Sequence, residues 1–414
     1  MKKISHRYVR KTAAGVVALS MLCAAAIPSV LAMPAGAASA SGDLNGDGSV
    51  TAADVAILQT SLLGGTALTA EQYANADVTG DGAVDGLDLT RLRQMAAVVP
   101  VSDAIAIHLS DSGITVEGDT KGVTAVSGKA VTISASGNYT VDGSITDGQI
   151  LVNIPDTTAD SDAVSLYLQD VTMTSSNGAP CILGQSAKKL KLTCSGENTL
   201  TDTAAEANAD TSGVIYGDCD ITVTKNSTGT LNITSSMNTA IRSKDDIKLN
   251  GGAVVINTDV DDTSDADAIR ANNTLEVDGA SVSITSSADG LKSSKEDVSI
   301  LSGKVSIKVG NDAVQAATAL NISGGTVIAS GDRGFTLDEN GTLAITGGDV
   351  LATATDYAFG MDSSGAAVTV DTSGCTQGVV QLDYAAEWKK SNAVTLKKGS
   401  DTVFEMTPNK KYTY

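Results

Sequence analysis

Apolar residues recur in three columns through the second half of the chain. Successive members of the first column lie 28, 23, 22 and 23 residues apart, and the other two columns keep similar steps. The first column contains Ile247, Leu275, Val298, Leu320 and Leu343, the second Leu231, Val254, Val282, Val305, Val327 and Val350, and the third Ile215, Ile241, Ile269, Leu291, Val314 and Phe335. Each member lies in a short alternating segment, which predicts three short strands per repeat.

A turn that contains glycine separates the first column from the second in each repeat. These turns are Gly251–Gly252, Asp278–Gly279, Ser302–Gly303, Gly324–Gly325 and Gly347–Gly348. Short strands turned by glycine at a fixed period predict a mainly β fold, a right-handed parallel β-helix, whose coils stack about 4.8 Å apart. A β-sandwich or a propeller is the alternative, but sandwich strands are longer and propeller blades repeat every 40 residues or so, on the order of twice this period.

The β-helix domain is predicted over residues 101–380. Residues before Ile215 fit the repeat more loosely and are interpreted as earlier coils with a longer excursion at Asp202–Asp210. Residues 381–414 break the register and are predicted to form a C-terminal cap, because a solenoid needs a cover at its open end. We expect Val379–Leu382 and Val403–Met406 to pair with each other at this end.

Two copies of one loop, Gly42–Asp54 and Ala76–Asp88, precede the repeats at an offset of 34 residues. Their oxygen-bearing residues have the spacing of an EF-hand calcium loop, with a glycine at the sharp turn. A helix is predicted after each loop, at Asp54–Leu63 and Asp88–Ala97, and none before either loop. The predicted Ca²⁺ ligands are Asp43, Asn45, Asp47, the carbonyl of Ser49 and Asp54 in the first loop, and Asp77, Thr79, Asp81, the carbonyl of Ala83 and Asp88 in the second.

With these loops and helices, residues 42–98 resemble a type I dockerin, a small all-α calcium-binding module of two loop–helix repeats. The resemblance implies that the partner is a cohesin module of a cellulosome scaffold. It places the cohesin-binding residues at Ala52, Ala53, Gly86 and Leu87. These are not the hydroxyl pairs of the best-known members, so the type of cohesin stays open. A plain calcium-stabilised linker is the alternative interpretation.

Residues 1–40 are predicted to be a signal peptide, with a basic start, an apolar stretch at Ala13–Ala32 and small-residue cleavage sites. A transmembrane anchor is the alternative. Loss of the five basic residues in this segment takes the formal charge from −20 to −25. Such a charge disfavours nucleic acid and anionic membranes as partners, and we expect a secreted, extracellular protein.

Four cysteines remain after this segment: Cys181, Cys194, Cys219 and Cys375. They lack the spacing of zinc ligands. One disulfide or isolated small core residues are both compatible with this pattern.

Carboxylates gather beside the third apolar column. An insert carries Asp261, Asp262 and Asp265, and one Asp precedes the third strand of successive repeats, namely Asp267, Asp289 and Asp312, with Asn238, Asp245 and Asp246 on the coils before. Like charges stacked about 5 Å apart repel, so the column predicts a bound cation, and oxygen-only ligands favour Ca²⁺. The alternative is that Asp is common in turns for conformational reasons.

The phrases Asp267–Arg270 (DAIR) and Asp289–Lys292 (DGLK) resemble a family of secreted β-helix carbohydrate-binding proteins from cellulolytic clostridia, over residues 142–414. The resemblance implies binding of cellulose and acidic sugars, and calcium sites like those of family 9 pectate lyases at Asp261, Asp262 and Asp265, extended here to Asp267 and Asp289. If the protein is a lyase, Lys292 or Lys295 is the expected general base. Sugar carboxylates are expected to pair with Arg242, Arg270 and Lys292.

Three functions follow from these patterns. The first is a non-catalytic, calcium-dependent binder of plant cell-wall polysaccharide, acidic or cellulosic, docked to a cellulosome. The alternative is a calcium-dependent pectate lyase, and the third is an adhesin whose β-helix is only a stalk. A single Trp cannot supply an aromatic platform for neutral sugars, whereas Ca²⁺ can bridge protein and uronate carboxylates.

Overall fold

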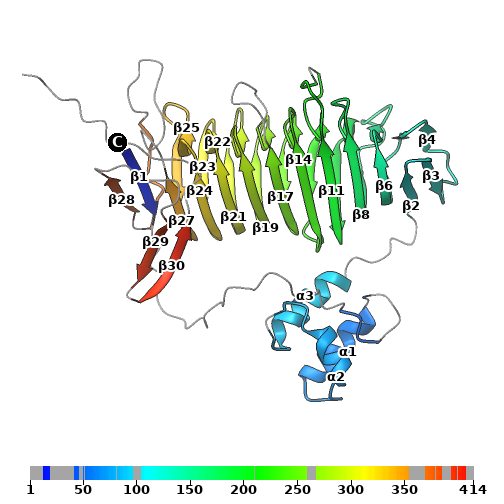
Figure 1. Cartoon of the computed structure of the whole chain (residues 1–414), viewed down its shortest axis with the longest axis horizontal. Helices are drawn as coiled ribbons and strands as arrows, with labels where there is room; N and C mark the ends of the chain where they lie inside the picture. Colours follow the sequence, from blue (N-terminus) through cyan, green and yellow to red (C-terminus); the bar gives the residue numbers. More distant parts are fainter. Residues whose placement is uncertain are drawn as a thin grey trace, which may run out of the picture.

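The computed structural model describes residues 13–18, 42–45, 50, 52–80, 82–96, 104–208, 210–258, 267–353, 369–377, 379–384, 393–398 and 400–406. A stack of parallel β-coils forms the larger part of this region, and three helices lie beside it (Figure 1). The mainly β fold, a parallel β-helix preceded by a small helical module, is therefore confirmed.

Each coil of the β-helix presents three walls, and the third is a ten-stranded sheet of its own. Wall 3 contains β4 (Thr124–Ser127), β5 (Ala130–Ile133), β7 (Gln149–Asn153), β9 (Ile182–Ser186), β12 (Ile215–Gly217), β15 (Ile241–Ser243), β18 (Ile269–Ala271), β20 (Leu291–Ser293), β22 (Asp312–Ala316) and β25 (Arg333–Leu337).

Walls 1 and 2 belong to a second, larger sheet, because some strands run through both. Wall 1 contains β10 (Lys189–Ser195), β13 (Asp220–Val223), β16 (Ile247–Leu249), β23 (Ala319–Ile322) and β26 (Thr342–Ile345). Wall 2 contains β11 (Glu197–Asp202), β14 (Thr230–Ser235), β17 (Ala253–Thr258), β24 (Thr326–Ser330) and β27 (Asp349–Thr353). The strands that cross both walls are β6 (Gly137–Thr146), β8 (Ala163–Ser175), β19 (Leu275–Ser286) and β21 (Val298–Val309).

The stacking register reproduces all three predicted columns. Along wall 1, Ile247 pairs with Leu275, and the pairing continues through Val298 and Leu320 to Leu343. The other two columns pair in the same way from coil to coil. No member of the three columns is more than 2% exposed. Each buried aliphatic side chain contributes about 1.5–3 kcal/mol, so these columns contribute substantially to the stability of the β-helix.

The glycine turns between walls 1 and 2 are also confirmed. The second residue of each pair has a positive φ, from 66° at Gly252 to 98° at Gly279. A Cβ atom on Gly303 would lie 2.3 Å from the carbonyl oxygen of Ala280 on the preceding coil. Only glycine fits where a left-handed conformation and close coil contact coincide.

Two antiparallel hairpins close the N-terminal end of the β-helix. β2 (Ile105–Ser110) pairs with β3 (Gly113–Glu117), and β4 pairs with β5. Both hairpins also join the first parallel coil, through β6 and β7. They cover an edge that could otherwise pair with another chain. The sequence patterns predicted only loosely fitting coils here and missed this cap.

The strands after wall 2 do not pair as expected. β28 (Val379–Tyr384) pairs antiparallel with β1 (Ala13–Ala18), which also meets β27, whereas β29 (Val394–Lys398) and β30 (Asp401–Met406) form a separate hairpin. The predicted pairing of Val379–Leu382 with Val403–Met406 is therefore wrong. Only two residues separate β29 from β30, so this hairpin closes at a lower entropic cost. β1 lies inside the segment predicted to be a signal peptide, and its cleavage stays a prediction.

The helical module contains α1 (Ala52–Leu62), α2 (Ala70–Ala76) and α3 (Gly86–Ala96). A small core that includes Leu58 and Leu92, both 0% exposed, joins α1 to α3. The two expected helices are confirmed within two residues at each end. Among the described residues, no helix is long and apolar enough to cross a bilayer.

Helix α2 contradicts the expectation that no helix precedes either loop. Its N-terminus has a capping box, in which the side chain of Thr69 accepts from the Gln72 amide and the side chain of Gln72 accepts from the Thr69 amide. Gln72 also donates to the carbonyl oxygen of Leu44 at 2.9 Å. A capping box and a tertiary contact stabilise a seven-residue helix that is too short to form alone.

Candidate functional site

Three buried carboxylates stand one above another at the start of wall 3. Asp267, Asp289 and Asp312 precede the paired inward residues of β18, β20 and β22 by two positions, and each is at most 3% exposed. The predicted column is therefore confirmed as a structural feature. Thr239, not Asn238, occupies the corresponding position on the preceding coil, because Ile241 pairs with Ile269.

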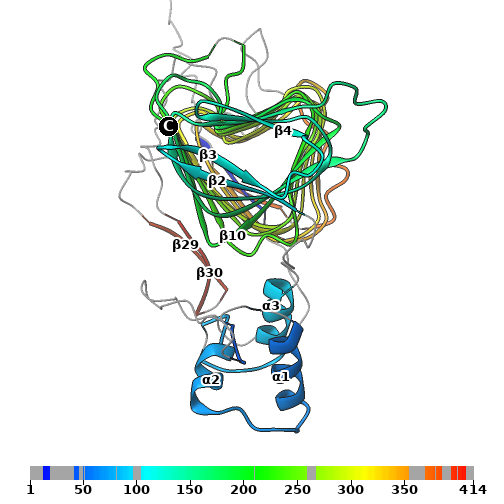
Figure 2. The same cartoon turned by 90° about the vertical axis from the view of Figure 1, so that its right-hand side faces the viewer.

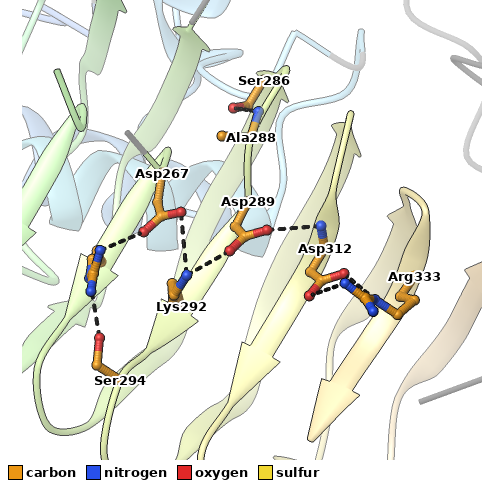
Figure 3. Close-up of polar contacts among 9 residues, drawn as sticks. Asp267, Ser286, Ala288, Asp289, Lys292, Ser294, Asp312 and Arg333 are labelled. Atoms are coloured by element: carbon orange, nitrogen blue, oxygen red, sulfur yellow. Dashed lines mark hydrogen bonds and ion pairs between the residues drawn. The ribbon is translucent and has the colours of Figure 1, made fainter. Parts of the chain in front are cut away.

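Cations on the same wall neutralise these carboxylates (Figure 3). Lys292 Nζ lies 2.8 Å from Asp289 Oδ2 and 3.7 Å from Asp267 Oδ1. Arg270 Nη1 approaches Asp267 Oδ2 at 3.4 Å. One coil further, Arg333 Nε donates to Asp312 Oδ1 at 2.6 Å and Arg333 Nη2 donates to Asp312 Oδ2 at 3.2 Å. We call these six residues the charge ladder. The sequence pattern predicted a bound cation beside the carboxylate column and did not indicate that three side-chain cations pair with it.

The backbone adds a further partner to the charge ladder. The Asp312 amide donates to Asp289 Oδ1 at 3.0 Å, so both oxygens of Asp289 are engaged. Arg270 Nε donates to Ser294 Oγ at 3.2 Å, which orients its guanidinium along the wall. Buried charges are stable only when paired and hydrogen-bonded, and the charge ladder meets both conditions.

Burial shifts the acidities of this group strongly. It raises the pKa of Asp267 to about 7, although Lys292 and Arg270 pull the pKa down. Burial likewise raises the pKa of Asp312 against the effect of Arg333. For Lys292, burial lowers the pKa, but Asp267 and Asp289 outweigh it and leave the pKa above its ordinary value. Lys292 is therefore held as a cation at neutral pH.

The predicted sugar-binding cations share one column on the outward side of wall 3. Arg242, Arg270 and Lys292 are paired in register on successive coils. Arg242 lies over the ring of Tyr216, 6.0 Å from its centroid, and Lys244 lies 5.6 Å from the same centroid. Sequence patterns gave no reason to single out Tyr216, which a fold-dependent register places beside Arg242. Lys295, the other predicted general base, is exposed and lies two residues beyond the end of β20.

A second acidic cluster lies elsewhere on the coils. Carboxylate oxygens of Asp220, Asp245 and Asp246 lie within 4.8 Å of one another. Asp245 and Asp246 lie on the coil before Asp267, as expected, but outside the carboxylate column, because they follow β15 at the turn that leads into wall 1. Burial and these two neighbours raise the pKa of Asp220, and Lys189 approaches it at 3.6 Å.

The two dockerin-like loops turn their terminal carboxylates inward. Asp54 and Asp88 are both 0% exposed. Asp54 Oδ1 accepts from the amides of Leu44 and Asn45, and Asp88 accepts from the amide and hydroxyl of Thr79 and from the Asp85 amide. Each carboxylate thus ties the end of its loop to its beginning, which fits the closing ligand of a calcium loop.

Several predicted ligands lie outside the described residues, namely Asp47, Ser49, Asp81, Asp261, Asp262 and Asp265. Asp43, Asn45, Asp77, Thr79 and Ala83 belong to the described parts of the two loops. Of the predicted cohesin-binding residues, Ala52 and Ala53 begin α1, and Gly86 and Leu87 begin α3. Leu87 is 64% exposed, an unusual position for a large apolar side chain.

The four cysteines are free thiols. Cys181, Cys194 and Cys219 are buried, and burial raises the pKa of each to about 12. They act as small core residues, which decides between the two interpretations of the sequence.

Comparisons with known proteins agree with this architecture. A family model described as a carbohydrate-binding domain-containing protein matches residues 127–340, and the model of the dockerin type I domain matches residues 41–95. A carbohydrate-binding domain-containing protein of Acetivibrio thermocellus is 33% identical over 138 residues, which are 32% of this chain and 46% of the relative. The chain thus spans less than half of the curated relative that it matches.

A solved structure, the polysaccharide lyase-like protein from C. thermocellum in a gadolinium derivative, is 22% identical with a TM-score of 0.46, over 60% of this chain and 100% of that chain. The first family model covers more than half of the 414 residues. The chain therefore belongs to the family of carbohydrate-binding domain-containing proteins and carries a type I dockerin domain.

Proposed function

We propose that this protein is a secreted, non-catalytic binder of plant cell-wall polysaccharide, which docks to a cohesin module of a cellulosome scaffold. The observation that carries the binding site is the charge ladder on wall 3. Buried charges commonly make a protein less stable than apolar residues would at the same positions. Their presence on the outward side of wall 3 therefore points to a function in ligand binding.

The ligand class that best suits this face is an acidic polysaccharide. Arg242, Arg270 and Lys292 follow one another on successive coils, where strands are about 4.8 Å apart. Guanidinium and ammonium groups pair with carboxylates such as those of uronic acids. The chain as a whole carries a charge of −20, so this column gives an acidic polymer a local attraction that most of the surface lacks.

Calcium is proposed at two places. On wall 3, the proposed ligands are Asp261, Asp262 and Asp265 of the insert, together with Asp267 and Asp289, which would bind the ion in exchange for their contacts with Lys292. The raised pKa of Asp267 supports this proposal. Burial disfavours the ionised form of this carboxyl group, and a nearby divalent ion would stabilise that form. In the dockerin, Asp54 and Asp88 would close the two loops around Ca²⁺ together with the oxygen ligands that precede them.

A lyase is less well supported than a binder. Abstraction of the C5 proton of a uronate requires a neutral lysine, but the ion pairs of Lys292 stabilise its protonated form. Lys295, the other candidate base, is exposed and lies beyond the end of β20.

One experiment separates these functions. The secreted protein is applied to a glycan array that carries polygalacturonate, xylan and cellulose fragments, first with calcium and then with chelator. We expect calcium-dependent retention on the uronate polymers, and no rise in ultraviolet absorbance from unsaturated products during incubation with polygalacturonate. Retention only on neutral glucans would refute the acidic ligand, and unsaturated products would establish a lyase. Cohesin docking is tested separately, by pull-down with a panel of type I cohesin modules.

A further inference from the structure

The dockerin touches the β-helix through one face of α3. Arg91 Nη2 donates to the carbonyl oxygen of Thr228 at 2.8 Å, across 137 residues of sequence. Thr228 belongs to the turn between β13 and β14, and α3 lies beneath this edge of the coils in both views (Figures 1 and 2). A tertiary contact therefore exists between the two modules.

A cleft of about 770 Å³ marks the same contact. Thr90 and Arg91 line it on the helix side. The other side is the turn stack, which we define as residues 225–230 and 250–253 with Gly279 and Ser281 of three successive coils. Four residues of this stack are glycines and carry no side chain, so parts of its backbone are open to close approach by a helix.

Among the described residues, the Arg91 guanidinium donates to a carbonyl oxygen and pairs with no carboxylate. Burial accordingly lowers the pKa of Arg91. A half-buried guanidinium whose partner is a neutral carbonyl oxygen makes a modest contact, because the cost of desolvation offsets part of its hydrogen-bonding gain. Such a contact can be displaced by a stronger partner.

The residues that make this contact share a helix face with the predicted cohesin site. Leu87 and Arg91 are four positions apart on α3, as are Gly86 and Thr90, and Thr90 Oγ1 donates to the Gly86 carbonyl oxygen at 2.8 Å. A partner that covers Leu87 must approach over Arg91. The matching positions on α1, Ala52 and Ala53, lie 34 residues earlier and belong to the other loop–helix repeat.

We propose that the turn stack of the β-helix is a docking surface for α3, and that cohesin and β-helix compete for this face of the dockerin. Cohesin then binds the free protein preferentially over α1, and binding over α3 requires the two modules to separate. This inference rests on the proposed cohesin docking. It adds that the β-helix determines which of the two loop–helix repeats of the dockerin is accessible to cohesin.

The test uses the full secreted chain and the cohesin that binds it most tightly in the panel. Asn226→Trp places bulk on the turn stack without changing the dockerin, since Asn226 lines the cleft and is exposed. Asn257→Trp is the matched control, at an exposed position of β17 outside the cleft. Each is combined with Ala53→Arg, which leaves only the α3 face, or with Leu87→Arg, which leaves only the α1 face.

Calorimetry should show that Asn226→Trp lowers the dissociation constant for cohesin about threefold to tenfold in the Ala53→Arg protein. This factor corresponds to the net free energy of one hydrogen bond between the β-helix and α3, which cohesin then no longer has to break. The same change should have no effect in the Leu87→Arg protein, and Asn257→Trp should have none in either. Small-angle scattering should show a larger radius of gyration for Asn226→Trp than for Asn257→Trp. Equal affinities of the two Trp variants in the Ala53→Arg protein would overturn the competition while leaving cohesin docking intact. Absence of cohesin binding to the parent chain would overturn both.

Discussion

Replacement of Lys292 by methionine is the sharpest test of the charge ladder. The Lys292 side chain is 19% exposed and serves Asp267 and Asp289, whose side chains are 4% and 3% exposed. Its removal leaves two buried carboxylates short of a cation, and breaking a buried ion pair costs about 3–5 kcal/mol. Because Arg270 still reaches Asp267 and methionine keeps the apolar stem covered, we expect the free energy of unfolding at pH 7.5 to fall by roughly 3 kcal/mol.

The loss should depend on pH with a definite sign. The pKa of Asp267 in the folded protein is about 7, above its ordinary value of 3.8, so the native state binds this proton more tightly than the unfolded chain does. The contribution of Asp267 to stability is therefore complete below about pH 4 and is lost as the pH rises through 7. Without Lys292 the pKa rises further, and at pH 5 Asp267 is protonated in parent and variant. The destabilisation at pH 5 should then be about half of that at pH 7.5, since only Asp289 remains unpaired.

Urea unfolding of the β-sheet signal in circular dichroism measures both values. Chelator is present throughout, so that calcium cannot replace the lost ammonium. Lys295→Met is the matched control, because Lys295 is an exposed lysine on the same coil, and it should change stability by less than about 0.5 kcal/mol. Equal losses for the two variants, or a Lys292→Met loss that is the same at pH 5 and pH 7.5, would show that the ladder is not an energetically coupled unit.

Three further predictions concern the scaffold and the dockerin. Gly303→Ala should destabilise the β-helix by more than 1 kcal/mol or so, since its Cβ would meet the Ala280 carbonyl oxygen and its φ is 95°; urea unfolding that matches the parent would contradict this. Thr69→Ala should lower the stability of the dockerin by about 1 kcal/mol through loss of the capping box, and unchanged thermal unfolding of its helical signal would count against that role. Chelator should abolish the helical signal in circular dichroism while the β-sheet signal persists, and Asp88→Ala should halve the calcium bound by the dockerin, as measured by calorimetry. Helices that survive in the absence of metal would argue against calcium as the element that holds the loops together.

Much of the scaffold could be predicted from the sequence because a solenoid repeats its constraints. Val298 and Val305 lie in the predicted columns because an inward position must be apolar on every coil, and Gly303 lies at the predicted turn because every coil meets its neighbour there. The helices after the calcium loops followed from the same logic of duplication. Helix α2 was missed although its signal, Thr69 followed three residues later by Gln72, was present.

The candidate site was predicted only in part. A periodic Asp was enough to place Asp267 above Asp289. Which cations pair with these carboxylates depends on side-chain positions, both within one coil, as for Arg270 and Asp267, and between coils, as for Lys292 and Asp267. The Asp245–Asp246 pair was misplaced because a shift of a few residues within one coil moves a side chain to a different wall. The pairing of β28 was wrong because antiparallel partners at a chain end have no period to define their register.

By itself, the sequence determined the period, the inward columns, the glycine turns and the two metal-type loops, since each depends on a local pattern that recurs at a constant spacing. Only the tertiary structure decided that Lys292 bridges two buried carboxylates, that Arg333 grips a third, and that Arg91 reaches the carbonyl oxygen of Thr228. Except for the Lys292–Asp289 pair, which lies within one coil, these contacts join residues from different coils or different modules. Their energies depend on burial and on distances of a few ångströms, which exist only after the chain has folded.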